Sequence, residues 1–344
     1  MFEHFRDYAA GLKPALDAAF DSQLAQLLGK VIPHRSEGLR CLSGGKKIRG
    51  ALLCLVTETL GGRQEAAWPR AVAVELIQTA SLVHDDFVDQ HLTRRNRPAF
   101  WTLAGARRAV LLGDIVFSSA IHMMSELSRE DCRIVSRAIA ELSRGAYHEP
   151  LEPDTLLEEL DGTSYERIIS LKTGILFAAA CELGAVAAGA AAPVQRAWRR
   201  YGRQIGEAYQ IADDIHEVVR ALSSRSIGAK ELLELIPALL FFVPSSRPVL
   251  GQALAGGLAE SEGELEEAFL EELLLYCRKA AGLMQRKKQQ RLCAAVAELD
   301  GIMATEAPAN GEWLRLARRT PWDLIEMFDG TVQDDQPSLP QGVL

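Results

Sequence analysis

Proline is missing from long stretches of this chain, and no other feature constrains its fold as strongly. Between Pro98 and Pro150, and again between Pro193 and Pro237, the sequence contains no proline. Those stretches are rich in Ala, Leu, Glu and Arg, a composition that favours helix. Apolar residues three and four apart form one stripe over residues 72–87, as on an amphipathic helix. Because no convincing run of alternating strand residues is present, we predict an all-α fold.

Composition places the chain among globular proteins and excludes several classes of partner. Of its 344 residues, 48% are hydrophobic and 24% are charged, which is typical of neither a disordered nor a fibrous protein. Lys and Arg number 38 against 46 Asp and Glu, and the resulting net charge of −8 argues against a nucleic-acid partner. The six cysteines include no C-x-x-C pair, so we expect reduced thiols in a cytoplasmic protein.

The domain organisation also follows from the sequence. No linker divides the chain and its last residues have the composition of a tail, so we predict one domain over 1–330 and a flexible tail over 331–344. The first residues lack the apolar segment of a signal peptide. Residues 174–192 are long enough to span a membrane, but they are mostly Ala and Gly with Glu182 in the middle. We therefore predict a packed core helix and no membrane span.

Two acidic clusters lie within apolar helical sequence. They consist of Asp85, Asp86 and Asp89, and of Asp213, Asp214 and Glu217. In each, carboxylates at i and i+4 share a helix face, where like charges repel. A single such cluster also occurs on ordinary solvated faces, but a second one with the same spacing favours metal binding. Oxygen ligands without a His or Cys pattern select hard cations, so we predict Mg²⁺ between two facing helices.

Basic residues near these clusters predict an anion site. The motif GGKKIRG places a glycine turn before Lys46, Lys47 and Arg49 at the start of a helix, where backbone N–H groups also attract anions. Arg94 and Arg95 follow the first acidic cluster closely enough to bind phosphate oxygens that the metal ions also contact. Each basic group alone is typical of a surface patch, but acids and bases together predict a pocket for a diphosphate ester.

Six ordered motifs resemble those of the trans-polyprenyl diphosphate synthases, the polyprenyl synthetase family. They are GGKKIRG, VELIQTASLVHDDFVD, RRNRP, VLLGDIVFSSA, SLKTGILF and YQIADDI, over about residues 40–220. The resemblance implies a single-domain bundle of about ten or more helices around a deep central cavity, and normally a homodimer. It also implies Mg²⁺-dependent condensation of isopentenyl diphosphate with an allylic diphosphate, with release of pyrophosphate.

The resemblance further implies a role for each matching residue. Mg²⁺ on the allylic diphosphate would be bound by Asp85, Asp89 and Asp213, with Asp86, Asp214 and Glu217 completing the two metal-binding clusters. The allylic diphosphate itself would contact Arg94, Lys172 and Lys230. Isopentenyl diphosphate would contact Lys46, Arg49, Gln78 and Arg95. Thr173 and Gln210 would lie beside the reacting carbons.

Product length is expected to depend on the residues one helical turn before Asp85. In the family, aromatic side chains there stop chain growth early and small ones allow it to continue. Ala80 and Ser81 are both small, so the resemblance implies a product longer than farnesyl. Candidate residues for the cavity floor on a neighbouring helix are Phe117, Ile121, Met123 and Met124, for which ordinary core packing is the alternative role.

The chain departs from the family pattern at several positions. Gly50 replaces a proline, Gln78 a frequent histidine, Ala146 a common glutamate, and Glu217 the third aspartate of the second acidic motif. Beyond Glu217 only Lys230 and Pro237 match. Two alternatives therefore stay open: a terpene cyclase on the same scaffold, and a non-catalytic subunit of a heteromeric synthase. Retention of Lys46, Arg49 and Arg95 argues against the cyclase, which has no second diphosphate to bind.

The first acidic cluster provides a direct test of this interpretation. We expect Asp85→Ala to lose most turnover of the diphosphate substrates, because it removes a ligand of the metal ions that stabilise the leaving group. The fold should stay intact, since the substitution relieves local charge repulsion. Turnover and the circular dichroism spectrum of the variant would be measured together, and nearly full activity would contradict the proposed site.

Overall fold

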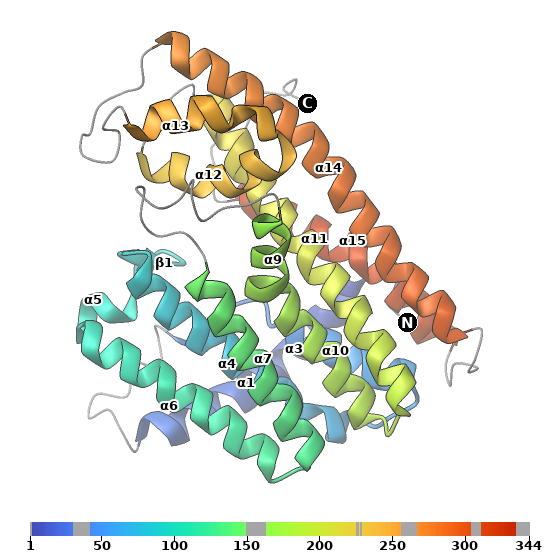
Figure 1. Cartoon of the computed structure of the whole chain (residues 1–344). Helices are drawn as coiled ribbons and strands as arrows, with labels where there is room; N and C mark the ends of the chain where they lie inside the picture. Colours follow the sequence, from blue (N-terminus) through green and yellow to red (C-terminus); the bar gives the residue numbers. More distant parts are fainter. Residues whose placement is uncertain are drawn as a thin grey trace. The chain divides into compact units, whose positions relative to one another are not determined.

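The predicted all-α fold is confirmed. The computed structural model describes residues 2–29, 42–148, 163–224, 227, 229–255, 267–303 and 311–334. Helices form nearly all the regular structure of these residues (Figure 1). The exception is a hairpin of two short strands, β1 (Thr93–Arg94) and β2 (Arg97–Pro98), paired antiparallel. The sequence pattern predicts no strand here, because two-residue strands are too short to show an alternation of polar and apolar residues.

The helices follow one another with short connections between most of the described ones. In the first half of the chain they are α1 (Phe5–Gly29), α3 (Ile48–Thr59), α4 (Gln64–Val88), α5 (Phe100–Ala104), α6 (Ala106–Ser125) and α7 (Arg129–Tyr147). In the second half they are α9 (Ser164–Ile169), the π-helical turn η1 (Ser170–Gly174), α10 (Ile175–Ala187), α11 (Ala192–Ser224), α12 (Ala229–Phe242), the short 3₁₀ turn η2 (Pro244–Ser246), α13 (Arg247–Ala255), α14 (Glu267–Met303) and α15 (Gly311–Asp334).

Contacts between residues divide the chain into two compact units. Unit 1 consists of residues 1–140, 176–202 and 296–323, and unit 2 of residues 141–175, 203–295 and 324–344. The prediction of one domain over 1–330 stays a prediction. Helix α15 continues to Asp334, and the rest of the expected tail, 335–344, lies outside the described residues.

In unit 1, α4 lies in the core and packs against α1, α3, α5 and α6. Leu76 and Ala80 of the predicted stripe are completely buried, and Val83 is 5% exposed. The predicted stripe over residues 72–87 is therefore the buried side of this helix. A buried ion pair joins α4 to α7: Arg70 donates two hydrogen bonds, of 2.6 and 2.8 Å, to the carboxylate of Asp131, which has no exposed surface.

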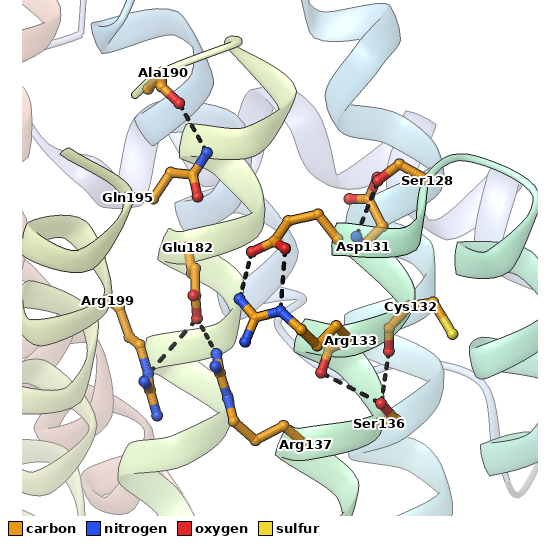
Figure 2. A network of polar contacts seen from close by, with 11 residues as sticks. Ser128, Asp131, Cys132, Arg133, Ser136, Arg137, Glu182, Ala190, Gln195 and Arg199 are labelled. Carbon is orange, nitrogen blue, oxygen red and sulfur yellow. Dashed lines mark hydrogen bonds and ion pairs between the residues drawn. The ribbon is translucent and has the colours of Figure 1, made fainter. Parts of the chain in front are cut away.

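A polar network that includes the middle of α7 explains why an acid lies in the alanine-rich helix α10. Figure 2 shows Glu182 between Arg137 of α7 and Arg199 of α11, both of which form ion pairs with it. Burial raises the pKa of the Glu182 carboxyl, and the two guanidinium groups oppose that shift. Paired in this way, Glu182 is tolerated in the core of unit 1, as expected for a packed helix.

Unit 2 has its own apolar core, built by α9, α11, α12, α13 and α14. Tyr165, Ile211, Leu239 and Leu273 are among its buried members. Among the described residues, one segment passes a length and composition test for a membrane span, Ser164–Ala187, and 83% of its most apolar window is buried. Its apolar surface therefore packs inside the protein, as predicted for this part of the chain.

Candidate functional site

The first acidic cluster lies at the C-terminal end of α4. The helix ends at Val88, so Asp89 is its capping residue, although its N–H still bonds to the carbonyl of Asp85 at 2.8 Å. Gln90 follows with a φ of 56°, and the N–H of His91 bonds to the carbonyl of Asp86 at 2.9 Å. This is a Schellman ending, with Gln in the left-handed position that Gly usually occupies. The negative end of the helix dipole adds to the charge of the cluster, so the site favours cations.

Within this cluster Asp86 differs from its neighbours. It is 4% exposed, and its Oδ1 accepts a hydrogen bond of 2.6 Å from Nε of Arg94. Burial raises the pKa of Asp86, and Arg94 opposes the shift. Asp86 thus holds the guanidinium of Arg94, which the sequence predicts to contact the allylic diphosphate. Asp85 and Asp89, one helical turn apart, stay the predicted metal ligands of this cluster.

The hairpin that follows brings Arg95 to the glycine turn of GGKKIRG. Its two turn residues, Arg95 and Asn96, have φ values of 53° and 57°, as in a type I′ turn. A Cβ atom on Gly45 would lie 2.7 Å from an Nη atom of Arg95, so the absence of a side chain at Gly45 makes this approach possible. Two basic motifs that are far apart in the sequence therefore meet in unit 1, as the predicted anion site requires.

The residues of GGKKIRG face different surroundings. Helix α3 begins at Ile48, and Lys47 before it has a φ of 53° and is 4% exposed, with its ammonium 3.3 Å from the centre of the Phe20 ring. Burial lowers the pKa of Lys47. Lys47 therefore packs inward, away from the expected role of a helix-start cation. Lys46 is partly buried, and Arg49 lies over the ring of Phe177 at 4.4 Å.

A buried glutamate supports this motif and was not identified from the sequence. Oε1 of Glu75, on α4, accepts a hydrogen bond of 2.8 Å from the backbone N–H of Gly50. The family's usual proline has no N–H to donate, so Gly50 is compatible with a bond that proline would remove. On the same helix, the backbone carbonyl oxygen of the partly buried Gln78 accepts a 3.0 Å hydrogen bond from the Ser81 hydroxyl.

The predicted chain-length residues lie where α4 meets α6. Ala80 is completely buried and Ser81 nearly so. Phe117 of α6 contacts the ring of His84 edge to face, with ring centres 5.6 Å apart. Gly113 permits this close approach, because a Cβ atom there would lie 2.1 Å from Nε2 of His84. Ile121, Met123 and Met124 lie on the same helix, and Met124 is completely buried.

The second acidic cluster lies within α11, in unit 2, and its three carboxylates are partly buried. Asp214 accepts hydrogen bonds from the hydroxyl of Tyr165, at 2.5 Å, and from the amide of Gln210, at 3.0 Å. Burial raises the pKa of Asp214 to about 7. Burial and repulsion by Asp214 raise the pKa of Glu217 to about 9. Tyr165 is 49 residues away in the chain, and no sequence signal pointed to it.

The π-helical turn η1 carries the Lys-Thr motif to this cluster. Oγ1 of Thr173 donates a 2.5 Å hydrogen bond to Oε1 of Gln210. Burial raises the pKa of Asp213, and the positive charge of Lys172 opposes part of that rise. Four predicted site residues of unit 2 thus meet: Lys172, Thr173, Gln210 and Asp213. A π turn inside a helix frequently marks a functional site. The backbone of Lys230 lies in the first turn of α12, and its side chain lies outside the described residues.

The donor set of both clusters fits a hard divalent cation. All the candidate ligands are carboxylates, which suit Mg²⁺ or Ca²⁺. In the second cluster the raised pKa values show that the negative charges are crowded and partly desolvated, a condition that a cation relieves. The first cluster belongs to unit 1 and the second to unit 2. That they face one another stays a prediction.

Sequence comparison relates the chain to known prenyl diphosphate synthases. The chain is 31% identical over 224 residues to a geranylfarnesyl diphosphate synthase of Methanosarcina mazei, covering 65% of this chain and 72% of the relative. It is 33% identical over 216 residues to heptaprenyl diphosphate synthase component 2 of Geobacillus stearothermophilus, covering 62% and 65%. Some other curated relatives are matched over only about half of their length.

Similarity in structure extends further along the chain. A crystal structure of a polyprenyl synthase from Caulobacter crescentus, complexed with calcium and isoprenyl diphosphate, matches with a TM-score of 0.72 and 25% identity. That match covers 93% of this chain and 97% of the other, and it confirms the predicted fold class. The family model for polyprenyl synthetase matches residues 38–227, more than half of the sequence. The chain therefore belongs to the polyprenyl synthetase family.

Proposed function

We propose that this protein is a Mg²⁺-dependent prenyltransferase that condenses isopentenyl diphosphate with an allylic diphosphate and releases pyrophosphate. The observation that carries the proposal is the pairing of each acidic cluster with a cation. Arg94 is held by Asp86 at the first cluster, and Lys172 lies beside Asp213 at the second. Metal ligands next to fixed cations are suited to the negatively charged oxygens of a metal-bound diphosphate.

The proposed chemistry makes specific use of these residues. Breaking the allylic C–O bond leaves a carbocation and a pyrophosphate anion, and Arg94 and Lys172 would stabilise the charge that develops on the anion. When bound, Mg²⁺ supplies further positive charge to the same oxygens. Thr173 and Gln210, which hydrogen-bond to each other, would lie beside the reacting carbons and orient them.

The anion site of unit 1 supports elongation over cyclisation. Arg95 lies against the glycine turn that precedes Lys46 and Arg49, so three cations of the predicted isopentenyl diphosphate site belong to one small region of unit 1. A cyclase, which ionises one diphosphate and folds the cation back on itself, has no use for this second anion site. The proposal therefore favours a transferase with two diphosphate substrates.

One relative keeps a second candidate function in view. The Geobacillus stearothermophilus protein is named as component 2 of a heptaprenyl diphosphate synthase. By analogy, this chain would be one subunit of a heteromeric enzyme. The substitution of Asp by Glu217 and the short match beyond it favour this alternative, whereas the complete first acidic cluster favours a chain that is active alone.

We further propose a cytoplasmic homodimer. Exposed apolar side chains on α5 and α6 support self-association, because Leu103, Val110 and Leu111 lie on neighbouring helices of unit 1. Sedimentation equilibrium of the purified chain would measure its mass, and a monomer at micromolar concentration would exclude the dimer.

Product analysis separates the candidate functions. The purified chain would be incubated with Mg²⁺, labelled isopentenyl diphosphate and, in turn, dimethylallyl, geranyl, farnesyl and geranylgeranyl diphosphate. We expect longer prenyl diphosphates, sized by chromatography. Hydrocarbon or alcohol formed without uptake of label would indicate a cyclase. No turnover with any primer would contradict an enzyme that is active alone and leave the heteromeric subunit.

Metal binding should be visible in the pH dependence of stability. The pKa values of Asp214 and Glu217 are raised to about 7 and about 9. The folded state therefore binds more protons than the unfolded one between about pH 4 and about pH 9. The stability that this contributes at low pH is lost as pH rises through those values. With chelator present, Tm should therefore fall between pH ~5 and ~9, and Mg²⁺ should raise Tm most at the alkaline end.

A matched pair of variants provides the control for this measurement. Glu217→Gln should flatten the pH dependence of Tm, because the amide does not titrate. Glu271→Gln, at an exposed position of α14 in the same unit, should leave the dependence unchanged. A Tm that stays constant over this pH range in chelator would contradict the crowding of charge in the second cluster.

The proposed product is longer than farnesyl, and Ala80 provides the test. Replacing the completely buried Ala80 by Phe places a ring one turn before Asp85, so chain growth should stop earlier. Product length would be measured with farnesyl diphosphate as primer, and an unchanged length would remove Ala80 from the proposed wall. Because the site is tightly packed, a Tm measurement should accompany the assay.

A further inference from the structure

The π-helical turn that carries Lys172 and Thr173 is held in place from α11. The Ser170 hydroxyl hydrogen-bonds to the carboxylate of Glu207, and Thr173 hydrogen-bonds to Gln210. Ser170 and Thr173 are three residues apart on η1, and their partners Glu207 and Gln210 are three residues apart on α11. The two hydrogen bonds therefore form successive links between η1 and α11. A π turn is less favourable than regular helix, and it persists where surrounding contacts determine its geometry.

Two glycines show how closely the neighbouring elements approach the turn. At Gly174, the last residue of η1, an added Cβ atom would lie 3.2 Å from Cγ of Glu207. At Gly145 of α7, an added Cβ atom would lie 2.8 Å from the backbone nitrogen of Lys172. The turn is therefore packed closely against α7 and against Glu207 of α11. Neighbouring residues consequently have little room to move in response to a change at Glu207.

Glu207 is itself fixed by an arginine from α14. It is 5% exposed, and its Oε2 lies 3.1 Å from Nε of Arg291. The same guanidinium contacts Gln204 at 3.3 Å and Glu166 at 3.1 Å. Arg291 thus joins α9, α11 and α14 at this point. All of these residues belong to unit 2.

Stability alone does not account for such a pair. A buried carboxylate and its arginine contribute little to stability compared with well-packed apolar residues, because both charges must be removed from water. What a buried pair does provide is a defined geometry, since the charge interaction and the Ser170 hydrogen bond both depend on the position of one carboxylate. That position lies one helical turn before Gln210 on α11.

We propose that Glu207, held by Arg291, is a positioning residue that sets the π turn through Ser170, so that Lys172 and Thr173 meet Gln210 and Asp213. This inference rests on the proposed function, in which Lys172 contacts the allylic diphosphate and Thr173 the reacting carbons. Loss of the link displaces both groups without removing either of them. A small displacement of Lys172 and Thr173 should slow the chemical step more than it weakens the binding of a substrate held elsewhere.

The kinetic test compares three variants with the wild-type chain. Ser170→Ala and Glu207→Leu should each lower kcat about tenfold or more. KM for isopentenyl diphosphate should stay within about twofold, because that substrate is assigned to Lys46 and Arg49 of unit 1. Glu207→Gln keeps an acceptor for Ser170 and should recover most of kcat. Ser170→Ala should change Tm by no more than about 2 °C.

A matched control and a second measurement make the result decisive. Ser223 lies on α11, where its hydroxyl bonds to the carbonyl of Val219 on the same helix, so Ser223→Ala should match the wild type. Hydrogen exchange of residues 164–178 should be about tenfold faster in Ser170→Ala and Glu207→Leu. This measurement needs no turnover, so it shows whether Glu207 holds the turn even if the product assay contradicts the proposed function.

The opposite results would overturn the inference. A kcat within about twofold of wild type in both Ser170→Ala and Glu207→Leu would show that the turn does not depend on this link. Unchanged hydrogen exchange over residues 164–178 in both variants would do the same. Faster exchange with unchanged kcat would reduce Glu207 to a structural role. A kcat loss that Glu207→Gln does not relieve would contradict the hydrogen bond as the cause.

Discussion

Negative charge held at the ends and inside apolar helices is the constraint on which the rest of this structure depends. Asp85, Asp86 and Asp89 lie at the negative end of the α4 dipole, and burial together with repulsion by neighbouring carboxylates raises the pKa values of Asp214 and Glu217 on α11. Such groups are costly unless positive charge lies close by. Arg94 and Lys172 supply part of it, and the oxygen-only donor sets suit a divalent cation for the rest.

The two clusters share a division of roles within the same D-D spacing. In each, the middle carboxylate is engaged with protein groups: Asp86 holds Arg94, and Asp214 accepts hydrogen bonds from Tyr165 and Gln210. Because successive residues on a helix point in directions about 100° apart, adjacent aspartates cannot serve one partner equally well. The middle carboxylates thus orient the groups around them, and the outer carboxylates stay the predicted metal ligands.

Segments of irregular backbone place cations in positions that regular helices alone would not give them. The Schellman ending of α4 and the type I′ turn after it direct Arg94 to Asp86 and Arg95 to the glycine turn before α3. The π turn between α9 and α10 similarly brings Thr173 to Gln210. In both units, regular helices provide rigid support and short departures from regular geometry aim the side chains.

Much of this was accessible from the sequence, for local reasons. Helix follows from proline-free stretches and from apolar spacing, and the carboxylates of each cluster share a helix because they are adjacent in the chain. Lys46, Arg94, Lys172 and Gln210 were identified because each lies in a short ordered motif. The buried position of residues 174–185 followed from the composition of the segment 174–192. The inward position of Lys47 was not predicted, because its contact with the ring of Phe20 joins residues that are far apart in the sequence.

Tertiary structure alone decided which distant residues complete the site. Tyr165 reaches Asp214, Glu75 reaches Gly50, and Arg291 reaches Glu207 across 49, 25 and 84 residues of sequence. No local pattern marks these partners, because a tyrosine, glutamate or arginine on a helix has the same local preferences whether it faces solvent or a buried carboxylate. The sequence by itself determined the helices and the chemistry they carry. Packing determined which charges are buried, and therefore which of them need a partner.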